Sequence, residues 1–168
     1  MDKENVMVPE LRFPGYDGEW EQRALADLII ALDSGKSVNS EDEAISSDQE
    51  WGVLKTSCVS GGEFFERENK RIIEEEVQLA KCPPEAGTII ISRMNTPMLV
   101  GESGYVSKDY PNLFLPDRLW MARVNQTDAI PKWLAFFLIT NKVRFTLKSI
   151  ATGTSGSMKN ISKPNFLS

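Results

Sequence analysis

Histidine is absent from the 168 residues of this chain, and cysteine occurs only twice. The lack of histidine excludes Ser-His-Asp and Cys-His nucleophile systems, His-ligated zinc sites and histidine proton shuttles. Two thiols, Cys58 and Cys82, are too few for a Cys-rich zinc site, and we expect both to be free in a cytoplasmic chain. No apolar run approaches the roughly 20 residues that a membrane helix needs. No membrane partner is therefore predicted.

Acidic residues are scarce in the second half of the chain. Residues 1–85 carry nine Lys and Arg against twenty Asp and Glu, a net charge of −11. Residues 86–168 carry ten against four, a net charge of +6, and Asp128 is the last acid. This asymmetry indicates a side that faces a polyanion, because the local field matters more than the total of −5. The alternative is that the two halves pair with each other in the fold.

The apolar pattern predicts one α+β domain, with a twisted, mixed or antiparallel sheet and a few helices. The strongest strand is 88–91, a continuous β-branched run of the kind that is buried on both faces. Residues 36–50 are polar and acidic without an apolar period, which predicts an exposed, mobile loop. Further elements are expected at 25–32 (helix or strand), 51–56, 99–106 and 117–124 (strands), and 74–81 (a helical turn).

One long helix is predicted over 131–150, with Pro131 at its first position. Apolar residues recur there at steps of three and four, which predicts that Trp133 and Phe136 lie in the core. Leu134 and Leu138 form a second apolar face. This face is either buried by the chain itself or contacts something outside it.

Two short motifs resemble catalytic sites but are incomplete. Residues 33–37 resemble the end of a phosphate-binding loop, but Ile30 occupies the position of the required glycine, so an ordinary turn is expected. Glu68 and Lys70, with Asp48 upstream, fit part of a metal-dependent nuclease site. No catalytic or metal-binding residue is predicted, and the nuclease is kept as an alternative.

Three loops rich in hydroxyl and amide groups follow predicted strands or the predicted helix: 55–62, 92–96 and 152–160. Lys and Arg suit phosphates, Ser and Thr suit phosphates or base edges, and Asn suits adenine. These loops therefore indicate contact with nucleic acid.

Several short segments, in their order and spacing, resemble a target recognition domain of type I restriction-modification specificity subunits. The segments are PELRFPGY at 9–16 with Trp20, LADL at 25–28, GTIIISR at 87–93 with Asn95, Thr96 and Gly101, and Pro131, Trp133 and Arg144 followed by ATGTSG at 151–156. The resemblance extends from about residue 7 to the end.

The resemblance implies that residues 1–168 form a single target recognition domain of the fold found in these subunits. Residues 1–20 are then an extended N-terminal arm, 131–150 the C-terminal helix, and 151–168 the start of a connection to a missing spacer helix. The implied function is to read one half of a bipartite site in double-stranded DNA and to direct methyltransferase and restriction subunits. The chain itself is expected to be non-catalytic. S-adenosylmethionine, ATP and magnesium are expected only in the partner subunits.

The expected DNA-binding residues fall into two groups. Phosphate contacts are predicted for Arg93, Lys142, Arg144, Lys148 and Lys159. Base-edge contacts are predicted for Lys55, Ser57, Asn95, Thr154, Ser155 and Asn160. Thr96 is expected to bind DNA without an assigned role. Two alternatives remain at this stage: Arg144 pairs with the acidic half or caps helix carbonyls, or the chain is a protein-binding module that uses its second apolar helix face without contacting DNA.

Overall fold

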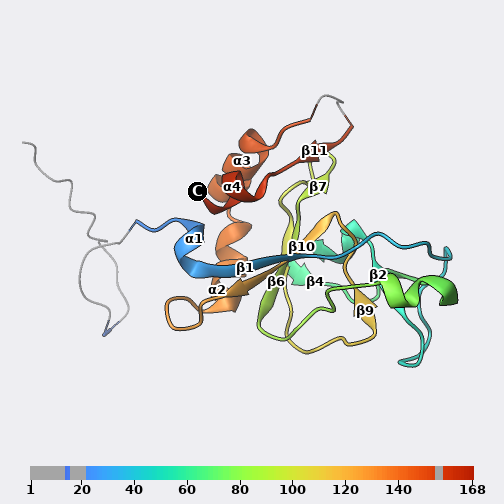
Figure 1. Cartoon of the computed structure of the whole chain (residues 1–168). Coiled ribbons are helices and arrows are strands. Elements are labelled where there is room, and N and C mark those ends of the chain that lie inside the picture. The colour runs from blue at the N-terminus through green and yellow to red at the C-terminus, as the bar shows by residue number, and fades with distance from the viewer. Residues whose placement is uncertain (1–13, 16–21, 154–156) are drawn as a thin grey trace, which may run out of the picture.

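The computed structural model describes residues 14–15, 22–153 and 157–168. Its centre is a six-stranded sheet of order β1-β10-β6-β8-β4-β3 (Figure 1). Its strands are β1 (Ile29–Ser34), β3 (Val59–Ser60), β4 (Gly62–Phe64), β6 (Thr88–Ser92), β8 (Ser103–Tyr105) and β10 (Leu119–Val124). All neighbours are antiparallel except β4 and β8, which are parallel. The predicted α+β class with a mixed sheet is confirmed.

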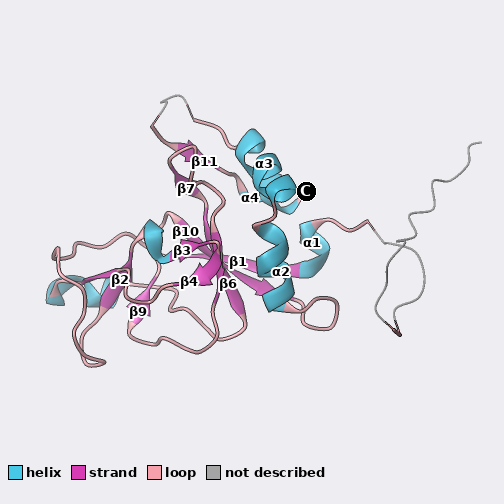
Figure 2. Cartoon of the chain, turned by 180° about the vertical axis from the view of Figure 1, so that it is seen from behind, coloured by secondary structure: helices cyan, strands magenta, loops and turns pink. Residues whose placement is uncertain are grey.

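Two smaller sheets and short helices complete the described structure. One sheet joins β5 (Asn69–Arg71), β2 (Gly52–Leu54) and β9 (Leu113–Phe114), and a two-stranded ribbon joins β7 (Met94–Asn95) and β11 (Lys159–Asn160). The helices are α1 (Leu25–Leu28), α2 (Pro131–Leu138), α3 (Asn141–Ile150), α4 (Lys163–Leu167) and the 3-10 helices η1 (Thr56–Cys58) and η2 (Glu74–Leu79). The α-helices gather at one end of the molecule and the three-stranded sheet lies at the other (Figure 2).

The central strands β6 and β10 are covered on both faces. All residues of β6 are buried, and so are all of β10 except Arg123. Because side chains alternate along a strand, Ile89 and Trp120 join a cluster with α2, whereas Ile90 and Met121 join a second cluster on the opposite face. The β-branched run at 88–91 predicted this double burial correctly.

The predicted single helix over 131–150 is two helices in the structure. Thr140 is extended, with φ −59° and ψ 147°, and separates α2 from α3. Its hydroxyl donates to the carbonyl of Phe137 over 2.8 Å. A threonine side chain that bonds to the nearby backbone competes with helix formation. The spacing of apolar residues carries no information about such a bond. The apolar residues spaced three and four apart on either side of Thr140 therefore belong to two helices and do not form one continuous face.

The buried face of α2 is the opposite of the one predicted. Leu134 and Leu138 are 0% and 1% exposed, whereas Trp133 and Phe136 are 53% and 48% exposed. This chain's own residues bury the two leucines, so the idea that an outside partner covers them is wrong. Seven consecutive apolar residues from Trp133 leave no polar residue to mark the outer face. Trp133 instead stacks on Phe137 at the surface, with ring centroids 5.3 Å apart.

The last described segment completes the core. Ile161 and Phe166 are 0% and 1% exposed, and the Phe166 ring packs 5.8 Å from that of Trp120. Residues 161 and 166 therefore belong to the core cluster, residue 167 packs against it, and α4 contacts α1. That 151–168 begin a connection to a spacer helix stays a prediction. The predicted N-terminal arm lies almost entirely outside the described residues.

The two cysteines are free, as predicted. Cys58 is buried, and burial raises the pKa of its thiol. Cys82 is half-buried, and its pKa is raised to about 11, mainly by burial. Within the described ranges, no helix has the length and apolarity to span a membrane.

Truncating a side chain on the buried face of α2 should lower the free energy of unfolding more than truncating one on its exposed face. Leu134→Ala should lower the free energy of unfolding by about 2–5 kcal/mol, because it leaves a cavity against the sheet. Trp133→Ala should cost about 1 kcal/mol, since the ring is half exposed and stacks mainly on Phe137. Urea unfolding of both variants measures the difference. Equal losses would contradict the observed orientation of α2.

Candidate nucleic-acid interface

One edge of the six-stranded sheet gathers several cations. At this edge β1 and β6 end and β10 begins, because Ser34 pairs with Trp120 and Leu119 pairs with Ser92. The neighbouring residues Lys36, Arg93 and Arg118 therefore lie together, and we call them, with the β7–β11 ribbon, the ribbon edge. The side chains of Lys36 and Arg118 are exposed and form no ion pair within the described residues.

The β7–β11 ribbon projects from this edge (Figure 1). Lys159 pairs with Asn95, and Asn160 pairs with Met94. Arg93 fixes the base of the ribbon. Its Nε donates to the carbonyl of Asp117 over 2.7 Å, and its Nη1 donates to Oδ1 of Asn160 over 3.4 Å. The ribbon therefore stands in a defined position on the sheet.

The structure brings five of the predicted DNA-binding residues together at the ribbon. They are Arg93, Asn95, Thr96, Lys159 and Asn160. Thr154 and Ser155 lie outside the described residues, on the connection between α3 and β11.

Asn95 and Thr96 differ in what they offer to a ligand. The side chain of Asn95 is buried, donates to Oγ of Ser92 over 3.1 Å and accepts from the Thr96 amide over 2.8 Å. Asn95 therefore shapes the turn, whereas the Thr96 side chain is exposed. Lys159 is half-buried, and its Nζ donates to the carbonyl of Gly153 over 3.2 Å.

Arg144 points into the protein, so the predicted phosphate contact does not fit its position. Its guanidinium donates to the carbonyls of Val100 and Met98 and pairs with Glu102. Burial lowers the pKa of Arg144, and Glu102 opposes that shift. Arginine 144 lies one helical turn before the buried Leu147, on the face that α3 turns inward. Glu102 belongs to the basic half, residues 86–168, and Val100 and Met98 lie outside the helices. The alternative expected from the sequence, pairing with the acidic half or capping helix carbonyls, is therefore not the one observed.

The other two predicted lysines of α3 stay near the surface. Lys142 is exposed and Lys148 is half-buried. Neither α2 nor α3 contains an acidic residue. Both lysines therefore remain predicted phosphate contacts.

Lys55 and Ser57 are engaged away from the ribbon. The Ser57 hydroxyl donates to Glu68 over 2.6 Å, and Lys55 pairs with the same carboxylate over 3.0 Å. The Ser57 bond, followed by the Lys55 bond, lowers the pKa of Glu68. This carboxylate neutralises Lys55, so the two residues form a weaker candidate contact than the ribbon.

The geometry does not assemble the alternative nuclease site. Glu68 is held by Ser57 and Lys55, whereas Lys70 pairs with Asp42. In the part of the chain that the structure describes, no three metal-ligating side chains lie close enough to hold an ion. Asp48 is exposed.

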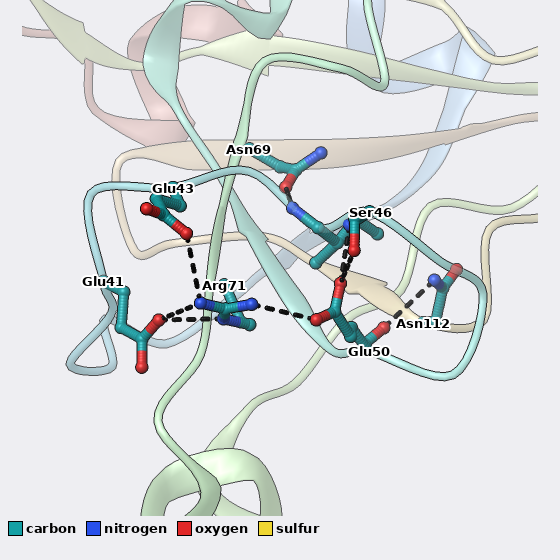
Figure 3. A network of polar contacts seen from close by, with 8 residues as sticks. Glu41, Glu43, Ser46, Glu50, Asn69, Arg71 and Asn112 are labelled. Carbon is teal, nitrogen blue, oxygen red and sulfur yellow. Dashed lines mark hydrogen bonds and ion pairs between the residues drawn. The ribbon is translucent and has the colours of Figure 1, made fainter.

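The acidic segment 36–50 is attached to the three-stranded sheet by Arg71. Its guanidinium binds the carboxylates of Glu41, Glu43 and Glu50 (Figure 3). The backbone of residues 41–43 also hydrogen-bonds the backbone of Arg71. The predicted exposure of this segment is correct. The segment is also a loop, as predicted, since it contains no helix or strand. Its attachment to Arg71, 21 or more residues away in the sequence, was not predicted.

Comparison with known proteins gives a consistent result. No protein-family model matches the chain. Over 149 residues, 89% of the chain, it is 27% identical to the type I restriction enzyme EcoEI specificity subunit of Escherichia coli. The resemblance to type I specificity subunits is confirmed.

The fold comparison agrees. A crystal structure of the S subunit of a type I restriction-modification system from M. genitalium superimposes with a TM-score of 0.53 and 18% identity over 96% of this chain. The chain spans 25% of the length of the curated relative and 36% of that solved chain. It therefore corresponds to a part of each specificity subunit.

Sequence reasoning missed Lys36 and Arg118 at the ribbon edge. The sequence pattern puts Lys36 in an incomplete phosphate-binding loop and Arg118 in the predicted strand 117–124. Neither position indicates a contact with DNA. Both are brought to Arg93 by strand pairing between distant segments. One sequence feature could have indicated them: a cation directly beside the end of a predicted strand, the position that Arg93 has after 88–91.

The Arg71 cluster predicts a pH dependence of stability. The pKa of Glu50 is lowered to about 2 by the Ser46 amide first, then by Arg71 and the Ser46 hydroxyl. A lowered folded pKa gives stability that is full above the ordinary value of 4.5 and is lost as the pH falls toward 2. Thermal unfolding from pH 6 to 2 should therefore show a smaller loss for Glu50→Gln than for the wild type. Glu75→Gln, which removes an exposed carboxylate outside this cluster, serves as the control. Identical pH profiles for wild type and Glu50→Gln would contradict this assignment.

Proposed function

We propose that this chain is a target recognition domain of a type I restriction-modification specificity subunit. In this proposal it reads one half of a bipartite site in double-stranded DNA and catalyses no reaction itself. The observation that carries the proposal is the ribbon edge, where Lys36 and Arg118 are exposed and pair with no carboxylate among the residues that the structure describes. The similarity to the EcoEI specificity subunit supports it.

The ribbon edge matches what duplex recognition needs. A two-stranded ribbon fits the major groove, which is about 12 Å wide. Arg93, Arg118 and Lys36 would contact phosphates beside it and fix the register, since phosphate contacts position a protein on DNA. The exposed hydroxyl of Thr96, next to the ribbon, would reach a base edge. Thr154 and Ser155 remain predicted base contacts.

The remaining activities belong to partners in this proposal. Methyltransferase subunits would bind S-adenosylmethionine, and a restriction subunit would use ATP and magnesium. The chain would direct both to its site in the cytoplasm, without a cofactor of its own.

A second candidate function is protein binding through α2. Trp133, Phe136 and Phe137 are 42–53% exposed, and neighbouring exposed aromatic rings often mark interfaces. This function alone predicts no salt-dependent binding of DNA, so one titration separates the two candidates.

The test of the proposed function is a titration of labelled duplex DNA at several salt concentrations. Affinity of the wild type should fall steeply with salt, because each neutralised phosphate releases counterions. The single domain should bind in the range of roughly 10⁻⁴–10⁻⁶ M, as non-specific complexes do. No binding at low salt, or a flat salt response, would contradict the proposal.

Charge removal locates the interface. Lys36→Gln and Arg118→Gln should each weaken binding to all sequences alike and reduce the salt slope by about 1. Lys108→Gln is the matched control, since Lys108 is exposed beyond the opposite end of β8. Equal effects of all three variants would exclude the ribbon edge as the contact surface.

A further inference from the structure

A single buried ion pair links three segments at the ribbon edge. Arg144 of α3 and Glu102, just before β8, lie 2.7 Å apart, with side chains only 10% and 16% exposed. The second oxygen of the Glu102 carboxylate, Oε2, accepts from the amide of Gly61 over 3.0 Å. The pair therefore connects α3 to the turn between β3 and β4.

The same guanidinium holds the turn that follows the ribbon strand β7. Its Nη1 donates to the carbonyl of Val100 over 2.8 Å and its Nη2 to that of Met98 over 3.1 Å. Arginine is suited to this role because its N–H groups form a rigid fork. The space is tight, since a Cβ on Gly101 would lie 3.0 Å from Nη1 of Arg144.

Both turns lie at the edge where the ribbon stands. Gly62 pairs with Gly104 and Ser103 pairs with Ile91, which places the Gly61 turn beside the end of β6. The Ser92 amide donates to the Glu102 carbonyl over 2.8 Å, so Glu102 directly adjoins Arg93. The exposed hydroxyls of Ser60 and Thr96 are carried by these two turns.

We infer that Arg144 and Glu102 are positioning residues that hold the Ser60–Gly61 turn and the Thr96–Val100 turn as one DNA-reading unit. The inference rests on the proposed function and adds to it how two turns are held in position. Neither side chain would touch DNA. Their effect is to fix two hydroxyl-bearing turns relative to each other, so that both meet the same duplex in one register.

Glu102→Gln breaks one link of this unit while preserving its shape. The amide oxygen of Gln still accepts from Arg144, but its NH₂ group faces the Gly61 amide and cannot accept from it. Arg144→Lys is the second variant, because it keeps the charge opposite Glu102 but replaces the two nitrogens that bind the Val100 and Met98 carbonyls with a single nitrogen. Glu63→Gln is the matched control: Glu63 is an exposed carboxylate on the neighbouring β4, and its loss changes net charge equally.

The readout is the base preference selected by each purified protein from a random duplex library, with salt slope and thermal stability measured in parallel. We expect Glu102→Gln and Arg144→Lys to lower the ratio of selected to unselected affinity about tenfold. The salt slope should stay unchanged, because the phosphate-binding cations remain, and Glu63→Gln should select the wild-type sequence.

Three results would overturn the inference, and they can be told apart. If the wild type selects a sequence and both folded variants select it equally well, the positioning role is wrong while the proposed function stands. If the wild type binds no duplex at low salt, the proposed function fails and the inference fails with it. Loss of selection only in proportion to lost thermal stability would also contradict a specific positioning role.

Discussion

Burial of β6 and β10 on both faces is the constraint on which the rest of this structure depends. One face is covered by α2 with Leu134, and the other by a cluster that includes Leu54 of the three-stranded sheet. Neither face is left for a ligand, so polar function is confined to the ends of the strands. The ribbon edge is one of those ends, and its cations flank strands whose positions the core has already fixed. A recognition surface on such a frame is rigid at its base and variable only in its turns.

The elements that could be predicted from the sequence are those whose pattern has one structural solution. The β-branched run at 88–91 fits only a doubly buried strand, and the flanking Arg93 then had to lie at a strand end. The face of α2 could not be predicted, because Trp133 and Leu134 are both apolar and the choice depends on what fits against the sheet. Arg144 is similar: a cation on a helix looks solvent-facing until carbonyls of the 98–100 turn and Glu102 are placed beside it.

The ribbon itself was beyond sequence reasoning for a physical reason. Each of its strands has two residues, too few for any alternation to show, and they are joined only through tertiary contacts. Asn160 and Arg93 are 67 residues apart, and Lys163 reaches the carbonyl of Leu32 across 131 residues. The composition of the loops predicted DNA-binding residue types, but it did not predict that the last segment returns to the sheet and brings Lys159 and Asn160 to Asn95 and Thr96.

Within the described residues, a cluster of carboxylates and a cluster of cations lie at separate places in the fold. Glu41, Glu43 and Glu50 are held at the three-stranded sheet, away from the ribbon with its Arg93 and Lys159 (Figure 1). In the proposed function, a duplex would repel the net charge of −5 at long range, while its field would turn the cationic ribbon edge toward it. The orientation is set within a screening length of about 8 Å at physiological salt. The carboxylates that Arg71 fixes in place would therefore make backward encounters unproductive and leave the ribbon edge as the side that arrives first.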